Sequence, residues 1–98
     1  MDLHLTDWPP PALYDFPYTG LGNLIVVPHA DMVCAELGVR SKVGATFYGC
    51  SLWTAGGCLI VLPKISHIIS KRNQAMVRRV ENANCNGWPH FWNGKQRE

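Results

Sequence analysis

The feature that most constrains the fold is a long final helix predicted between Ser66 and about Asn84–Asn86. Ser66 is a residue type that often caps a helix start, and Gly87 is a typical C-terminal stop. Apolar residues recur in this segment at spacings of three and four, as in a helix that packs one face on a core. They are Ile65, Ile68, Ile69, Met76, Val77, Val80 and Ala83. We therefore expect the core to be built against this helix.

Upstream of this helix, short apolar runs alternate with turn signals. The predicted elements are a strand at Leu24–Val27, a helix at His29–Leu37 with Gly38 as its stop, and strands at Val43–Leu52 and Cys58–Leu62. The last strand is apolar on both faces and should be central. The Gly56-Gly57 turn before it predicts an antiparallel hairpin. We expect an α+β domain, with a small antiparallel β-sheet packed against one long C-terminal helix and one short helix.

Residues 1–23 form an arm rich in proline and aromatic residues. Trp8-Pro9-Pro10-Pro11 favours polyproline II, and Asp15-Phe16-Pro17-Tyr18 continues the alternation of aromatic residues and prolines. Such a segment cannot pair into a central strand, but its rings can lie on an apolar surface. It either packs on its own domain or binds a partner, and the burial tendency of aromatic rings favours the first interpretation.

With 98 residues, the chain has the length of a single domain, 1–98, and its net charge of +2 does not by itself indicate a nucleic-acid partner. No apolar run approaches the roughly 20 residues that span a membrane. Met1–Asp7 lacks the basic start and apolar stretch of a signal peptide. A cytoplasmic location is therefore expected, with no membrane partner.

The cysteines are Cys34, Cys50, Cys58 and Cys85, even in number but widely spaced. They allow three disulfide pairings. A reducing cytosol favours free, mostly buried thiols, ahead of disulfides and of a metal site.

The run Arg78–Pro89 contains Glu81 and ends in Cys85-Asn86-Gly87-Trp88-Pro89. It resembles the signature of small HExxH zinc-metallopeptidase-like proteins of phages and other mobile elements. In that family an Arg-His-Glu-x-x-His helix leads into Cys-Asn-Gly-Trp-Pro, and another His follows. Upstream similarities are Val27-Pro28-His29, Cys34, Gly44-Ala45 and Cys58–Pro63. The resemblance covers residues 24–92 and implies a minimal zincin-like core after the arm.

The zinc ligands of that family are replaced in this chain. Two histidines one helical turn apart can reach one zinc ion, and the Glu after the first activates the zinc-bound water. Here the histidine positions are Val80 and Asn84, and the third ligand position is Trp92. Glu81 alone remains, so the resemblance implies a degenerate site, with no catalytic residue, metal or cofactor. Glu81 is expected on the helix surface, solvated or paired with a basic residue.

Other residues could rebuild a metal site, but their spacing is unfavourable. Cys50 and Cys58 are too far apart for a zinc knuckle, and Cys85 points away from Asn84 on a helix. The histidines are His4, His29, His67 and His90, and a surface or hydrogen-bonded role is favoured for each.

Three functions are compatible with these patterns. The favoured one is a non-catalytic inhibitor that binds a protein of a bacterial host, in the manner of an anti-CRISPR protein; its setting is implied by the resemblance. Candidate partner-binding residues are Trp8, Tyr14, Phe16, Tyr18, Arg72, Arg78 and Arg79. The alternatives are an active zinc peptidase with rearranged ligands and a nucleic-acid-binding protein that uses the basic residues of the last helix.

Overall fold

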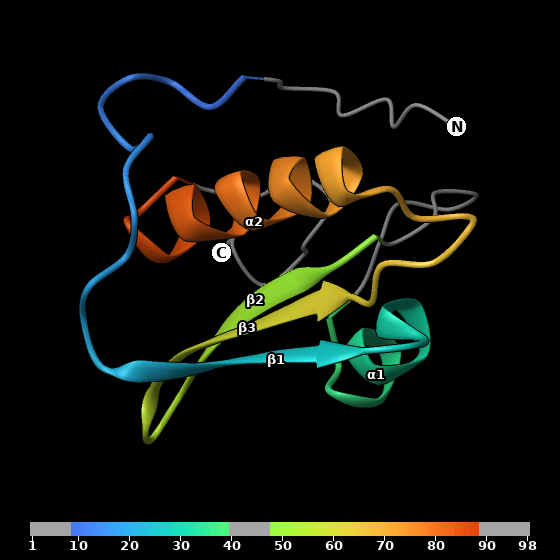
Figure 1. The fold of residues 1–98 in the computed structure, drawn as a ribbon. Coiled ribbons are helices and arrows are strands. Elements are labelled where there is room, and N and C mark those ends of the chain that lie inside the picture. Colours follow the sequence, from blue (N-terminus) through green and yellow to red (C-terminus); the bar gives the residue numbers. More distant parts are fainter. Residues whose placement is uncertain (1–8, 40–47, 89–98) are drawn as a thin grey trace.

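The computed structural model describes residues 9–39 and 48–88 of the chain (Figure 1). These residues form an α+β fold with a small sheet and two helices, as predicted. In chain order the elements are β1 (Gly22–Val27), α1 (Ala30–Glu36), β2 (Cys50–Thr54), β3 (Gly57–Pro63) and α2 (Lys71–Cys85). The part of the predicted second strand before residue 48 lies outside the described residues. Neither described helix is long and apolar enough to cross a bilayer.

The sheet has the strand order β1-β3-β2, so β3 is central as predicted. The hairpin of β2 and β3 is antiparallel, which confirms the prediction from the Gly56-Gly57 turn. The prediction of an antiparallel sheet is wrong for β1, which runs parallel to β3 with Leu24 beside Ile60. The chain passes through α1 and then β2 before it enters β3, and a connection of that length permits parallel pairing. The sheet is therefore mixed.

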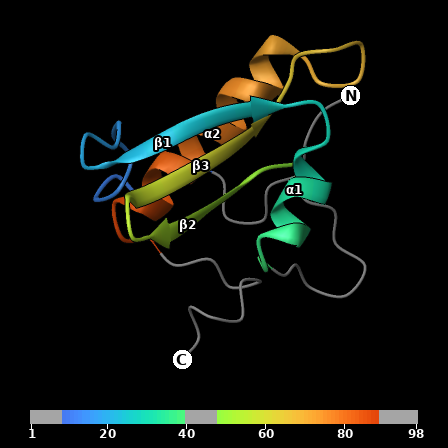
Figure 2. The same ribbon diagram turned by 90° about the horizontal axis from the view of Figure 1, so that it is seen from below.

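Each face of the sheet is covered by one helix (Figures 1 and 2). Side chains alternate along β3, so Cys58, Ile60 and Leu62 pack in one core cluster with Val77 of α2. Val61 lies in the other cluster, with residues of α1. The domain thus has two small cores, one above and one below the central strand.

The long helix begins at Lys71, later than predicted. Its N-cap is Ser70, whose Oγ accepts a hydrogen bond from the backbone N–H of Asn73 at 3.0 Å. Ser66 instead accepts hydrogen bonds from the N–H groups of Ile68 and Ile69 in the preceding loop. The assignment of Ile65 and Ile68 to the packed stripe was wrong, because both precede the helix and are exposed.

Both helices end at a glycine, as the sequence predicted. At the end of α2 the N–H of Gly87 donates to the carbonyl of Asn84, and the N–H of Trp88 donates to that of Ala83. This pair of hydrogen bonds is a Schellman motif, which requires a left-handed residue that glycine adopts without strain. Gly87 has φ +115°. The same pattern ends α1 at Gly38, with φ +86°.

The expectation of free thiols was wrong, because all four cysteines are paired. One disulfide joins Cys34 of α1 to Cys50 of β2, and the other joins Cys58 of β3 to Cys85 of α2. The expectation rested on an inferred compartment, whereas the fold brings each pair of Cα atoms to about 6 Å, 6.1 and 5.9 Å respectively. Each bond links one helix to one face of the sheet.

Candidate functional site

The helix positions that the resemblance equates with the zinc ligands and the catalytic Glu of a peptidase lie within the packed side of α2. Val80, Glu81 and Asn84 are 9%, 3% and 5% exposed, and Trp92 lies outside the described residues. The expected surface location of Glu81 is therefore wrong. Glu81 follows the buried Val77 by one helical turn, so it shares the inward face of the helix.

The Asn84 side chain is turned back onto its own helix. Its Nδ2 donates to the carbonyl oxygen of Val80 at 2.7 Å. Its Oδ1 is buried and has no hydrogen-bond partner among the residues that the structure describes. An amide in this position and the alkyl side chain of Val80 do not provide the two imidazoles that a zinc ion would need.

The cysteines are unavailable as zinc ligands in this structure, because a disulfide sulfur is not a thiolate. His29 and His67 are exposed, whereas His4 and His90 lie outside the described residues. Within residues 9–39 and 48–88, no group of three or more His, Cys, Asp or Glu side chains could hold a metal ion.

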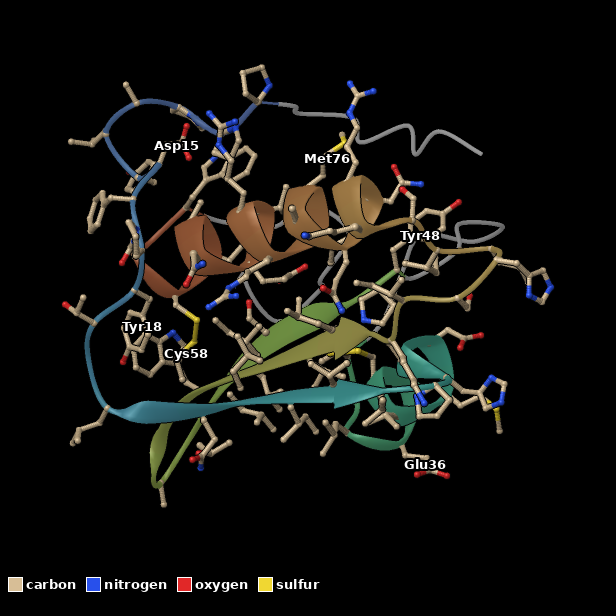
Figure 3. All side chains as sticks on the ribbon, in the orientation of Figure 1. Asp15, Tyr18, Glu36, Tyr48, Cys58 and Met76 are labelled. Atoms are coloured by element: carbon tan, nitrogen blue, oxygen red, sulfur yellow. A yellow bond between two sulfur atoms is a disulfide. The ribbon has the colours of Figure 1, made fainter. Side chains whose placement is uncertain are left out.

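Residues of the arm dock on the side of α2 that faces away from the sheet, where Figure 3 shows Asp15. Arg79 forms a bidentate ion pair with Asp15, with Nε to Oδ1 at 2.8 Å. Asn82 accepts a hydrogen bond at its Oδ1 from the backbone N–H of Tyr18. For this part of the arm, the interpretation of an arm packed on its own domain is confirmed.

The ion pair shifts the protonation equilibria of both partners. The hydrogen bonds from Arg79 lower the pKa of the Asp15 carboxyl, its charge adds to this effect, and partial desolvation opposes both. The pKa of Arg79 is raised, mainly by the same hydrogen bonds. Arg79 is thus engaged with the arm of its own chain. Arg72 and Arg78 are exposed.

The residues that resemble the end of the zinc-peptidase-like signature, Cys85–Pro89, include three with structural roles in this chain. Cys85 forms the disulfide to Cys58, and Gly87 ends the helix. Asn86 donates from its Nδ2 to the carbonyl oxygens of Tyr14 and Phe16, at 3.1 and 2.6 Å. These residues therefore position the arm and the end of α2.

An exposed apolar surface lies where the arm meets the β2–β3 hairpin. We call it the arm–hairpin surface and define it by Tyr18, Leu21 and Trp53. The rings of Tyr18 and Trp53 meet edge to face with centroids 5.9 Å apart, and the Tyr18 hydroxyl donates to the Leu21 carbonyl. Leu21 is 81% exposed and Trp53 62% exposed. Figure 3 shows Tyr18 beside Cys58, so the surface lies next to a disulfide.

The candidate partner-binding residues fall into separate groups in the structure. Tyr14 and Tyr18 are partly buried, Phe16 is exposed, and Trp8 lies outside the described residues. Trp53 was one of the aromatic residues that the sequence offered for an interface, although it was not among the selected candidates, and Leu21 was not predicted at all. Leu21 lies between two glycines, so no pattern indicated where its side chain would be placed.

Comparisons of this chain with protein-family models, curated proteins and solved structures give no match, so the resemblance to zinc-peptidase-like proteins rests on its sequence motif alone.

Proposed function

We propose that this chain is a non-catalytic protein-binding protein that contacts its partner through the arm–hairpin surface. The observation that carries the proposal is the exposure of Leu21 and Trp53 beside the partly buried Tyr18. Tryptophan and tyrosine are the residues most often found at the energetic centre of protein interfaces. By motif resemblance, the setting is a phage or other mobile element, and the partner a host defence protein that the chain inhibits in an anti-CRISPR-like manner.

The surface is held in place before any partner binds. Tyr18 is fixed by its backbone bond to Asn82, and the N–H of Cys58 donates to the Leu21 carbonyl. Gly57 permits this contact, because a Cβ there would lie 2.0 Å from the Leu21 oxygen. Preorganised apolar side chains lose little conformational entropy on binding, which favours affinity.

The buried inward face of α2 supports the non-catalytic part of the proposal. Val80 and Asn84 occupy the positions of the two helix ligands, and Asn84 bonds to its own helix. The two disulfides favour an oxidising compartment over the cytoplasm expected from the sequence, because cytosolic thiols are kept reduced.

Affinity capture with matched surface variants tests the proposal. The bait is the tagged, oxidised chain, incubated with an extract of a bacterial host that includes periplasmic proteins. Trp53→Ala should lose a partner that the wild-type chain captures in stoichiometric amount. Ile68→Ala, which changes an apolar residue of similar exposure (57%) in the loop before α2, should retain it. Equal capture by both variants would place the interface elsewhere.

Metal analysis of the same preparation tests the non-catalytic assignment. Protein purified without added zinc should contain far less than one zinc ion per chain. About one zinc per chain, removed by a chelator with loss of a peptidase activity, would overturn the proposal.

A further inference from the structure

β1 is an edge strand of the described sheet (Figures 1 and 2), and its apolar side chains are exposed. Leu24, Ile25 and Val26 are 41%, 37% and 49% exposed. At the opposite edge, β2 begins with Cys50 and Ser51, which are 0% and 5% exposed. Within the described residues, β1 is therefore the edge with more accessible side chains.

The backbone N–H and C=O groups of alternate β1 residues point away from β3. The carbonyl of Leu21 accepts from the N–H of Cys58, and the carbonyl of Val27 accepts from the N–H of Lys64, both at 2.9 Å. Because the backbone hydrogen-bonding groups of successive residues point to opposite sides of a strand, the odd-numbered residues of β1 bond to β3. The N–H and C=O groups of Gly22, Leu24 and Val26 consequently point outward at the edge.

β1 lacks the features that protect most exposed edges from pairing. Its sequence, Gly-Asn-Leu-Ile-Val-Val, contains no charged residue and no proline. Natural edge strands commonly carry lysine, proline or a bulge that prevents another strand from adding to the sheet. An open and apolar edge of this kind is a surface for strand addition.

We propose that β1 pairs in antiparallel fashion with β1 of a second copy of this chain, about a twofold axis at Leu24. In this register Leu24 faces Leu24 of the second copy, and Gly22 faces Val26. Each facing pair exchanges two backbone hydrogen bonds, so all the outward donors and acceptors of these residues are satisfied. The result is a continuous sheet through both copies.

The side chains favour a second copy as the occupant. Leu24 and Val26 lie on the α2 side of the sheet, since they pair with Ile60 and Leu62 of β3. The twofold axis brings these apolar side chains against their own equivalents, and β1 carries no charge that would be repelled. An axis at Ile25 would instead place Gly22 opposite Pro28, which has no N–H to donate.

The contact is small for a protein interface, because it consists of one strand edge and its flanking side chains. Interfaces at the low end of the size range are weak. We therefore expect dissociation constants on the order of micromolar or above. The inference does not depend on the proposed partner, because its interface is between identical strands.

Cysteine crosslinking tests the register directly. Hydrogen-bonded antiparallel pairs have Cα atoms about 5.5 Å apart, which suits a disulfide. The native cysteines are all paired, so Leu24→Cys introduces the one free thiol of the chain. Mild oxidation at high protein concentration should convert this variant to a covalent dimer. Val26→Cys, on the same face and similarly exposed, should crosslink at least tenfold more slowly, because its equivalent lies opposite Gly22.

Sedimentation velocity of the wild-type chain tests association without a new cysteine. The sedimentation coefficient should rise towards that of a dimer between about 10 μM and 1 mM. Val26→Lys, which adds a charge to the edge, should remain monomeric with an unchanged circular dichroism spectrum. A wild-type chain that stays monomeric throughout would overturn the proposal. Equal crosslinking of the two cysteine variants would overturn the register.

Discussion

The ion pair between Asp15 and Arg79 makes the position of the arm sensitive to acid. The pKa of Asp15 is lowered from its ordinary value of 3.8, so the carboxylate stabilises the docked arm above that pH. This stabilisation is lost as the pH falls through the lower pKa of the folded state. Both side chains reach solvent, with 49% exposure for Arg79 and 16% for Asp15, so salt should weaken the contact.

Backbone amide exchange of residues 12–18, followed by NMR, checks this prediction. Protection in the wild-type chain should persist at pH 4 and fall at lower pH. Asp15→Asn should show reduced protection already at pH 6, whereas Asp31→Asn, which alters an exposed acid on α1, should match the wild type. Unchanged protection in Asp15→Asn would show that the hydrogen bonds of Asn82 and Asn86 hold the arm without the ion pair.

Asn84 is a buried residue whose replacement by an apolar residue of similar volume should not destabilise the fold. Its Oδ1 has no hydrogen-bond partner within the described part of the chain. A buried acceptor without a hydrogen-bond partner lowers the free energy of unfolding by about 1–3 kcal/mol. Asn84→Leu removes this acceptor at similar volume. We expect a free energy of unfolding that is unchanged or raised by about 1 kcal/mol, measured by urea denaturation. Asn84→Ala, which leaves a cavity, should be less stable than Asn84→Leu. A loss of more than about 2 kcal/mol in Asn84→Leu would indicate a buried water on Oδ1.

At the scale of the elements, local signals were sufficient where one residue determines the geometry. Gly38 and Gly87 end the helices as predicted, and the Gly56-Gly57 turn forms the hairpin. The start of α2 was misplaced because Ser66 and Ser70 are equally good caps by residue type. The parallel direction of β1 depends on how the whole chain crosses the sheet, which no local pattern encodes.

The candidate site likewise combines features that local sequence patterns indicate with features that depend on the whole fold. The identification of Val80 and Asn84 with ligand positions came from the resemblance of the motif, which the sequence displays directly. The burial of Glu81 could not be predicted in this way, because it depends on which side of α2 faces the core. The arm–hairpin surface depends on the contact between the rings of Tyr18 and Trp53, which lie in segments distant in sequence.

The two serines before α2 provide a direct test of where the helix begins. Ser70→Ala removes the Oγ that accepts from Asn73 and should lower the free energy of unfolding by about 1 kcal/mol. Ser66→Ala removes hydrogen bonds from two exposed loop amides and should lower the free energy of unfolding by only about 0.3 kcal/mol. Thermal and urea unfolding of both variants give the comparison. A larger loss for Ser66→Ala would support a helix that starts at Ser66.

The whole molecule is organised as a sheet with one disulfide in each of its two cores. Cys34 and Cys50 lie in the cluster under α1, and Cys58 and Cys85 in the cluster under α2. A chain of 98 residues buries a limited apolar area, and here that area is divided between two faces. Crosslinks that fix each helix to the sheet offset this limitation.

Removal of each disulfide should therefore destabilise the fold strongly but affect different surfaces. Loop-entropy arguments give about 3 kcal/mol for the sequence separation of 16 and about 3.5 kcal/mol for that of 27. Paired Cys→Ala variants should unfold about 12–28 °C lower than the wild type. Because Tyr18 packs on the Cys58–Cys85 cluster, loss of that bond should also weaken partner capture. Loss of the Cys34–Cys50 bond should leave capture intact below the melting temperature.

Reduction of the wild-type chain distinguishes the contribution of the crosslinks to stability from the contribution of the packed sulfur atoms. It breaks both bonds without removing an atom, so a fall in melting temperature at least as large as that of either paired variant would assign the loss to chain entropy. Mass spectrometry after alkylation should find no free thiol before reduction and four after it. If reduction lowered the melting temperature by less than about 2 °C, the helices would be held by their apolar contacts and caps. In that case the two small cores would be sufficient for a fold of this size.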